Sequence, residues 1–227
     1  MDYREIDKIF HRDGYRLAHQ FLGEEITAAN LREAIQQLYR SVDELLEAFL
    51  GRTAQEGRPA ACKKGCSWCC HQAVFAVTHE FLFLHLFIEE HAGKPGVDKY
   101  LGKAREKATI TSRKTPEEQL LARFPCPFLE EGACAVYQAR PMACRIYLSY
   151  SVEACIESHR NPTDERRFPA LFEFPLRAGR MLNEGFVAYL KQSGLKSAEL
   201  PLEQGYLSME EQGQTMSGWI NLAHGSL

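Results

Sequence analysis

The chain has 227 residues, a formal net charge of -3 and eight cysteines. This length allows one or two domains, with a core that needs no disulfide to fold. Because the charge balance is slightly acidic, the chain lacks the basic excess typical of nucleic-acid-binding proteins, and we expect no nucleic acid partner. The longest apolar run, Phe81 to Ile88, is interrupted by His85 and too short to cross a bilayer, so we expect no membrane partner either.

Residues 1–10 alternate charged and apolar side chains and lack the apolar region and cleavage site of a signal peptide. We therefore expect a cytoplasmic protein. In that reducing compartment, an even number of cysteines favours metal or redox chemistry over a disulfide framework.

Helical periodicity begins near the N-terminus. A first helix is expected over residues 3–22, with Ile6, Ile9, Phe10 and Leu17 turned inward. A second is expected over residues 27–54, capped by Thr27, because apolar residues recur there at steps of four and three. This stripe consists of Leu31, Ile35, Leu38, Val42, Leu45 and Phe49. It predicts a helix that faces the core, and contact with a protein partner is the alternative.

The middle of the chain is also expected to be helical. Residues 78–91 predict an almost wholly apolar helix that belongs at the centre of the core, and residues 97–109 predict another. The sequence Thr115-Pro116-Glu117-Glu118 combines a capping box with proline at the first helical position. It predicts a short helix that ends at about Phe124.

The pattern changes after residue 126. Phe128-Leu129, the turn Glu130-Glu131-Gly132 and the run Ala135-Val136-Tyr137 predict short strands or a hairpin. Helical spacing returns over residues 175–190. Residues 201–227 are weakly patterned and are expected to form a loosely attached tail with one short helix.

These elements predict a mainly α fold in one compact unit, with a small, irregular, short-strand region rich in cysteine. Within it, residues 1–58 are expected to be N-terminal helices that pack on the core. Residues 59–160 are expected to form the metal-binding region with a helical insertion, and residues 161–227 a C-terminal helical segment and tail.

The distribution of the cysteines carries most of the chemical information. The first four, within nine residues, are Cys62, Cys66, Cys69 and Cys70, and the other four are Cys126, Cys134, Cys144 and Cys155. Thiolates at short spacing can bind one soft metal ion or an iron–sulfur cluster, since a single loop turn brings them to a common point. A metal would tie residues 62–70 to residues 126–155 and so contribute to folding.

Two details constrain the first group. Gly65 allows a positive φ just before Cys66, which turns backbone amides toward sulfur. Cys69 and Cys70 are adjacent, so both can ligate one centre only if the backbone bends between them. Otherwise one of the two serves a second centre, or none.

The second group is flanked by arginines. Arg140 and Arg145 lie on either side of Cys144. We expect them not to bind the metal themselves but to stabilise its ligands, by donating hydrogen bonds to sulfur or by offsetting negative charge. A solvated arginine pair is the alternative.

Cys66-x2-Cys69-Cys70, Cys126-Pro127-Phe128-Leu129, Cys134-x-Val136-Tyr137 and Arg140-Pro141-x2-Cys144-Arg145, in this order, resemble the YkgJ-type cysteine-cluster family, a zinc- or iron-chelating domain. The resemblance covers residues 62–155. It implies a bacterial cytoplasmic protein in which the clustered cysteines hold a metal ion or an iron–sulfur centre. The motif positions are the main ligands it implies, and Cys62 and Cys155 complete a candidate set of eight.

Eight thiols exceed the four that one tetrahedral zinc ion needs. The surplus favours an iron–sulfur cluster, of the 4Fe–4S type before others, or two metal ions, over a single structural zinc site. Because no acid, base or substrate-binding motif accompanies the cysteines, we expect metal binding without an assignable catalytic activity. A protein partner that contacts the helical stripe or the tail is the alternative role.

Three other functions are consistent with parts of the pattern. A similar cysteine block occurs in flagellin lysine methylases, where an iron–sulfur centre is implicated in methyl transfer to protein. The spacing Cys62-x3-Cys66-x-Trp68-Cys69 is similar to that of radical S-adenosylmethionine enzymes, but the helical sequence that follows does not predict their partial barrel. A thiol redox pair is the third, although no thioredoxin-like strand–helix pattern surrounds it.

The histidines add one candidate ligand. His71 follows Cys70 directly, whereas His79 lacks the second histidine that a zinc protease helix requires, and His85 is expected to be a core residue. The sequence contains no serine–histidine–aspartate arrangement, phosphate-binding loop or dinucleotide fingerprint.

Overall fold

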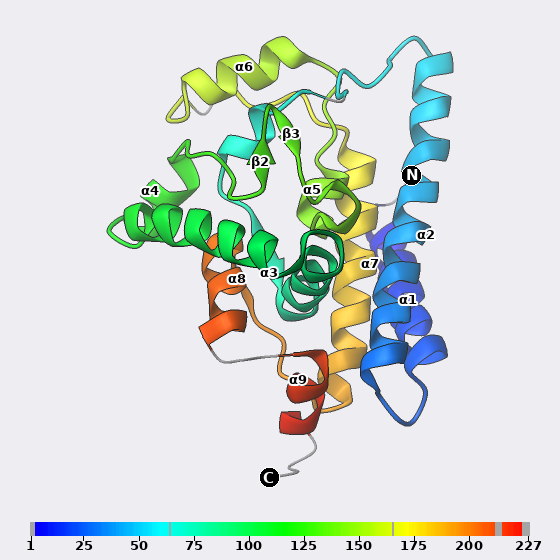
Figure 1. Ribbon diagram of the computed structural model, residues 1–227. Helices are drawn as coiled ribbons and strands as arrows, with labels where there is room; N and C mark the ends of the chain where they lie inside the picture. Colours follow the sequence, from blue (N-terminus) through cyan, green and yellow to red (C-terminus); the bar gives the residue numbers. More distant parts are fainter. Residues whose placement is uncertain (1–2, 64, 165, 212–214, 224–227) are drawn as a thin grey trace.

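Long amphipathic helices build one side of the molecule. In the computed structural model, which describes residues 3–63, 65–164, 166–211 and 215–223, the helices α1 (Tyr3–Leu22), α2 (Ala28–Gln55) and α7 (Glu173–Gln192) lie side by side (Figure 1). Thr27 caps α2: its hydroxyl accepts from the Asn30 amide at 3.2 Å, and the Asn30 side chain accepts from the Thr27 amide at 2.8 Å. The mainly α expectation is confirmed.

The predicted stripe of α2 faces the core. Its first four members are fully buried, and Leu45 and Phe49 are half-buried. The prediction for α1 is wrong at one position, since Ile9 is 43% exposed. The residues that α1 buries are Gly14, Ala18 and Leu22.

Two glycines allow α1 and α7 to approach so closely. A Cβ atom on Gly14 would meet the carbonyl oxygen of Leu182, and one on Gly185 would meet the carbonyl oxygen of His11, both at 1.9 Å. The helices therefore meet backbone to backbone at this crossing.

The helix α3 (Thr78–Thr111) consists of two arms. Gly93 interrupts it with φ 60° and ψ -168°, a conformation that glycine adopts at little cost. The arms correspond to the two helices expected over 78–91 and 97–109. The first arm lies at the centre of the molecule, as its apolar sequence predicts, with Phe81 and Leu84 fully buried.

Short elements follow the second arm of α3. The helix α4 (Pro116–Leu121) has the predicted capping box on Thr115, although it ends three residues before Phe124. The predicted hairpin is formed by β2 (Leu129–Glu130) and β3 (Ala133–Cys134), which are antiparallel and joined by Glu131 and Gly132, both at positive φ. The hairpin is followed by η2 (Tyr137–Ala139), α5 (Met142–Ile146) and α6 (Val152–Arg160), which the sequence did not predict.

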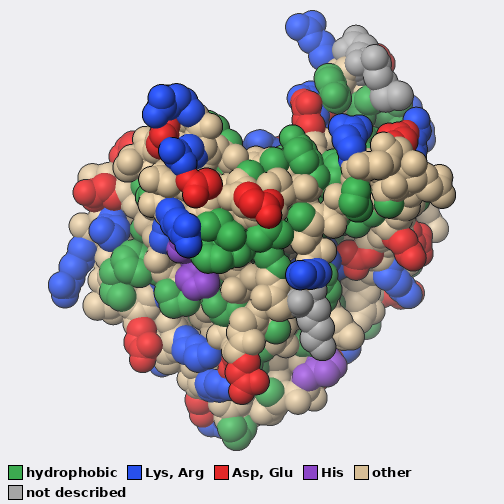
Figure 2. Space-filling view, turned by 90° about the horizontal axis from the view of Figure 1, so that it is seen from above, with side chains coloured by type: hydrophobic (Ala, Val, Ile, Leu, Met, Phe, Trp, Pro, Cys, Tyr) green, Lys and Arg blue, Asp and Glu red, His purple; other side chains and the backbone are tan. Residues whose placement is uncertain are grey.

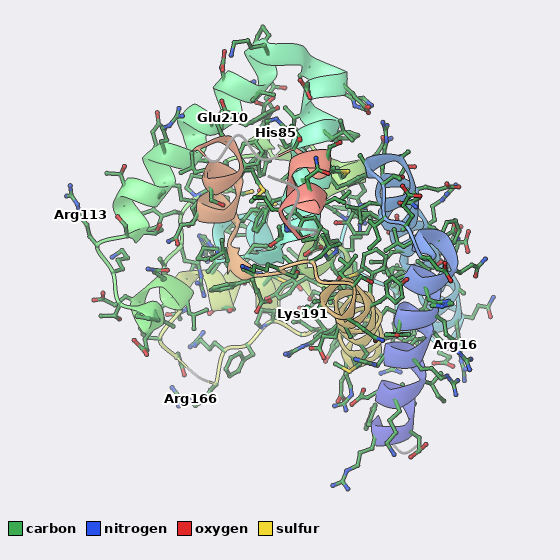
Figure 3. All side chains as sticks on the ribbon, turned by 90° about the horizontal axis from the view of Figure 1, so that it is seen from below. Arg16, His85, Arg113, Arg166, Lys191 and Glu210 are labelled. Carbon is green, nitrogen blue, oxygen red and sulfur yellow. The ribbon has the colours of Figure 1, made fainter. Side chains whose placement is uncertain are left out.

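The expectation of a loosely attached C-terminal tail is wrong for the described residues. The strand β4 (Glu199–Pro201) pairs antiparallel with β1 (Phe75–Val77), and α8 (Leu202–Glu211) and α9 (Met216–Ala223) follow it. The helix α8 lies against α3 (Figure 3), where Gly205 faces the ring of Phe81. Tyr206 and Trp219 are buried, so this segment belongs to the core.

Buried apolar side chains from α1, α2, α3, α5, α7, α8 and α9 form one continuous core. Among the described residues, no helix is long and apolar enough to span a membrane.

Candidate metal centre

The cysteines lie on loops and short elements that the helical core supports. In the upper half of Figure 1, the loop that contains η1 (Trp68–His71) lies beside the hairpin and contacts α6. The backbone amide of Cys126 donates to the carbonyl oxygen of Cys70 at 2.7 Å. The two cysteine groups, far apart in sequence, are therefore joined directly through the backbone.

The backbone bends where the adjacent cysteines require it. Gly65 has the predicted positive φ, 87°, and Cys69 and Cys70 lie in the tight turn of η1. Cys70 donates a hydrogen bond to Cys69, which lowers the pKa of Cys69 to about 7 and raises the pKa of Cys70. Cys69 is therefore the thiol of this pair that ionises most readily near neutral pH.

Four thiols act on one another through their charges, and we call them the inner thiol group: Cys70, Cys126, Cys134 and Cys144. Burial is the main cause that raises the pKa of Cys144 well above its usual value, and the charges of Cys126, Cys134 and Cys69 add to it. Burial likewise raises the pKa of Cys126 to about 11. The pKa of Cys70 is raised in part by Cys126 and Cys144, so these thiols act on one another as like charges.

Three further thiols form a second such set, which we call the outer thiol group: Cys62, Cys66 and Cys155. Burial is the main cause that raises the pKa of Cys62, and the charges of Cys69, Cys66 and Cys155 add to it. The pKa of Cys155 is raised by burial, with contributions from Cys66 and Cys69. Cys69 therefore acts through its charge on members of both groups.

Sequence reasoning missed Ser149, a buried residue that serves the outer thiol group. Its amide donates to the sulfur of Cys62 at 3.3 Å, and its side chain lowers the pKa of Cys155 by a hydrogen bond. Its carbonyl also accepts from the amide of Ala61 at 2.8 Å. No local motif marks this serine, because its partners come from segments far from it in sequence.

The two arginines play different parts from one another. Arg140 lowers the pKa of Cys134 through its charge. Arg145 is 1% exposed, stacks on the ring of Tyr39 at 3.9 Å and pairs with Asp43 at 2.5 Å. Its other donors reach the carbonyl oxygens of Arg140, at 3.0 Å, and Gln138. Within the described residues, the hydrogen bonds of Arg145 hold the loop before Cys144 against α2, and none of them reaches sulfur.

Glu80 is a second residue that sequence reasoning missed. Its carboxyl group is buried and accepts from the amides of Met142 and Val77, at 2.6 and 2.9 Å, and from the hydroxyl of Tyr39 at 3.2 Å. Burial raises the pKa of Glu80. Since Met142 begins α5, Glu80 fixes the helix that carries Cys144. The capping pattern at the start of α3 could have identified the Val77 contact but not the distant ones.

Aromatic rings cover one side of η1. His159, on α6, lies edge-on to Trp68 and to His71, with ring centroids 5.2 and 5.4 Å apart. One ring nitrogen of His71 bonds to the carbonyl oxygen of Ser67 at 3.0 Å. The face of the molecule that carries α6 and the cysteine-bearing loops gathers hydrophobic side chains, a class that includes cysteine, between acidic and basic ones (Figure 2).

The donor set suits zinc, iron or an iron–sulfur cluster, since each of them binds thiolates. Within the parts of the chain that the structure describes, no three histidine, cysteine, aspartate or glutamate side chains stand as a preformed metal-binding group. The thiols are neighbours through their charges and have to close further to coordinate an ion.

The comparison with protein families agrees with this donor set. The family model CxxCxxCC, described as "Putative zinc- or iron-chelating domain", matches residues 61–163. This range contains all eight cysteines, so the resemblance of the cysteine block to this family is confirmed, and it supports zinc or iron as a ligand. No curated protein and no solved structure matches the chain.

Proposed function

We propose that this cysteine-cluster domain holds an iron–sulfur cluster, of the 4Fe–4S type, through the inner thiol group, and that metal binding is the function of the site. The observation that carries the proposal is the mutual effect of thiols from separate segments: Cys144, on α5, has its pKa raised by Cys126, by Cys134 on the hairpin and by Cys69 on η1.

Electrostatics favours a cation at this point. Several buried thiols that raise one another's pKa cannot all ionise in the metal-free protein, since each charge opposes the next. The charge of Arg140 lowers the pKa of Cys134, but the larger effect of burial keeps this pKa raised. A bound metal centre supplies the missing positive charge and allows the thiols to deprotonate as ligands.

The number of thiols and their arrangement favour iron–sulfur chemistry over one zinc ion. The inner thiol group alone provides the four ligands of a cubane cluster. Cys69 acts on members of both groups, and the outer thiol group provides three further donors, which we assign to a second site or to delivery of metal to the inner one. Zinc bound by four of the eight thiols is the outcome that the experiment must separate from this one.

Anaerobic purification followed by measurement of iron, zinc and acid-labile sulfide tests the proposal. We expect iron and sulfide in equal amounts, with visible absorption from sulfur-to-iron charge transfer. Zinc in a colourless protein would overturn the cluster but keep metal binding. Less than one equivalent of any metal, with all thiols free, would overturn both.

Two serine substitutions separate the groups. Cys144→Ser removes a half-buried thiol of the inner thiol group, and we expect loss of the cluster absorption. Cys62→Ser removes the exposed thiol of the outer group and is the matched control, with the absorption retained. Equal loss in both variants, in proteins that remain folded by circular dichroism, would contradict the division into two groups.

A further inference from the structure

A pocket separate from the thiols lies between α2 and the first arm of α3. Its volume is about 370 Å³, within the range of small-molecule sites, which run from roughly 300 to 1,000 Å³. Both helices contribute one face: α2 provides positions 32, 36, 39, 40 and 43, and α3 provides positions 83, 86, 87, 90 and 91. Because these positions recur at helical spacing, the pocket is a groove that follows the two helices.

The floor of the groove is apolar and ordered. Phe83, Leu86 and Phe87 line it from α3. The ring of His91 stacks on Phe87 with centroids 4.0 Å apart, and one of its nitrogens bonds to the carbonyl oxygen of Phe87 at 2.8 Å. At the other end, Phe83 meets Tyr39 edge to face at 5.5 Å. Such a floor suits an alkyl or aromatic body.

Ion pairs close both ends of the groove. Arg32 donates two hydrogen bonds to Glu90, at 2.6 and 2.8 Å. Arg145 pairs with Asp43 at 2.5 Å. Both carboxylates of the lining, Glu90 and Asp43, are therefore already paired. Neither is available as a partner for Arg40, the remaining arginine of the lining.

The middle of the groove keeps free polar groups. Gln36 and Arg40 are one helical turn apart on α2, and within the described part of the chain neither side chain has a hydrogen-bond or ion-pair partner. The lining contains three arginines and two carboxylates, which leaves one positive charge above an apolar floor.

We propose that this groove binds a small organic monoanion, a carboxylate with an elongated apolar body. Its carboxylate pairs with the guanidinium of Arg40, which can donate two parallel hydrogen bonds, and accepts from the amide of Gln36. Its body lies on Phe83, Leu86 and Phe87. The site does not depend on which metal the thiols hold.

Calorimetric titration of the protein, as isolated, with octanoate tests the proposal. Acetate has the same charge without the body, and octyltrimethylammonium has the same body with the opposite charge. We expect saturable binding of octanoate at one site, and affinity at least tenfold weaker for each of the other two. Absence of saturable octanoate binding, or equal binding of either comparison ligand, would overturn the proposal.

Three variants place the ligand in the groove. Arg40→Gln should weaken octanoate binding about tenfold, since it removes a charged hydrogen-bond donor. Arg16→Gln, at an exposed arginine of α1 (Figure 3), is the matched control and should bind as the wild type does. Gln36→Trp should fill the groove and abolish binding while the core stays intact. Unchanged affinity in Arg40→Gln or Gln36→Trp would show that octanoate binds elsewhere.

Discussion

The crossing of α1 and α7 gives the sharpest test of the packing. A methyl group added at Gly185 would lie 1.9 Å from the carbonyl oxygen of His11 and 2.9 Å from the amide nitrogen of Tyr15, while real Cβ atoms do not come within 3.0 Å. The obstacle is backbone on both sides, so no side chain can move away. In Gly185→Ala the two helices must separate by about 1 Å, and the shift spreads along the buried surface that includes Ala18 and Leu190.

Overpacking of this kind costs about 1–3 kcal/mol, and the rigid backbone places Gly185→Ala at the upper end. For a protein of this size we expect a Tm roughly 6–12 °C below that of the wild type. The matched control is Gly51→Ala in α2, where an added Cβ would meet no atom within 4 Å. It should stabilise the helix by about 0.5–1 kcal/mol. Thermal unfolding followed by circular dichroism measures both, and a Gly185→Ala protein as stable as the control would refute the argument.

Three further predictions concern the groups around the thiols. Glu80→Gln should lower the free energy of unfolding in urea by about 1–3 kcal/mol, because one buried donor loses its acceptor; unchanged stability would contradict the role of Glu80. Arg145→Lys should cost about 2 kcal/mol, since an ammonium cannot reach Asp43 and two carbonyl oxygens at once, and an unchanged Tm would exclude this. In the metal-free protein, the pKa of Cys126 is raised from 9.0 to about 11, so the folded state keeps a proton that the unfolded state loses. The contribution of Cys126 to the free energy of unfolding is therefore complete below pH 9. About 2–3 kcal/mol of stability is lost as the pH rises from 9 to 11. Urea titrations across this pH range check the prediction. The Cys126→Ser protein should lose less stability over the same range, and an equal pH dependence in both proteins would contradict the prediction.

Local signals explain which elements could be predicted from sequence. Thr27 and Thr115 cap helices where their hydroxyls meet an amide three residues later, so both contacts are contained within one turn of chain. Gly65 and Gly132 likewise adopt positive φ because their own turns require it. The two cysteine groups follow the same rule, since their spacing predicts a thiol cluster without knowledge of the rest of the fold.

Contacts between distant segments explain what could not be predicted. The C-terminal segment has weak periodicity, and its helix α8 is buried only because Gly205 leaves room for the ring of Phe81. Arg145 looks like a partner for the neighbouring thiol in sequence. In the structure Asp43 and Tyr39, about a hundred residues earlier, draw its side chain toward α2. Neither outcome is encoded near the residue that shows it.

The backbone hydrogen bond between Cys126 and Cys70 bears on how the protein acquires its metal. Bringing residues 70 and 126 together costs roughly 3–4 kcal/mol of loop entropy in a flexible chain. Here the packing of the core and this hydrogen bond offset that entropy in the metal-free chain. In small zinc domains, by contrast, metal binding and folding are a single event. Metal should therefore leave and return without unfolding the chain, so that the occupancy of the site follows the supply of metal.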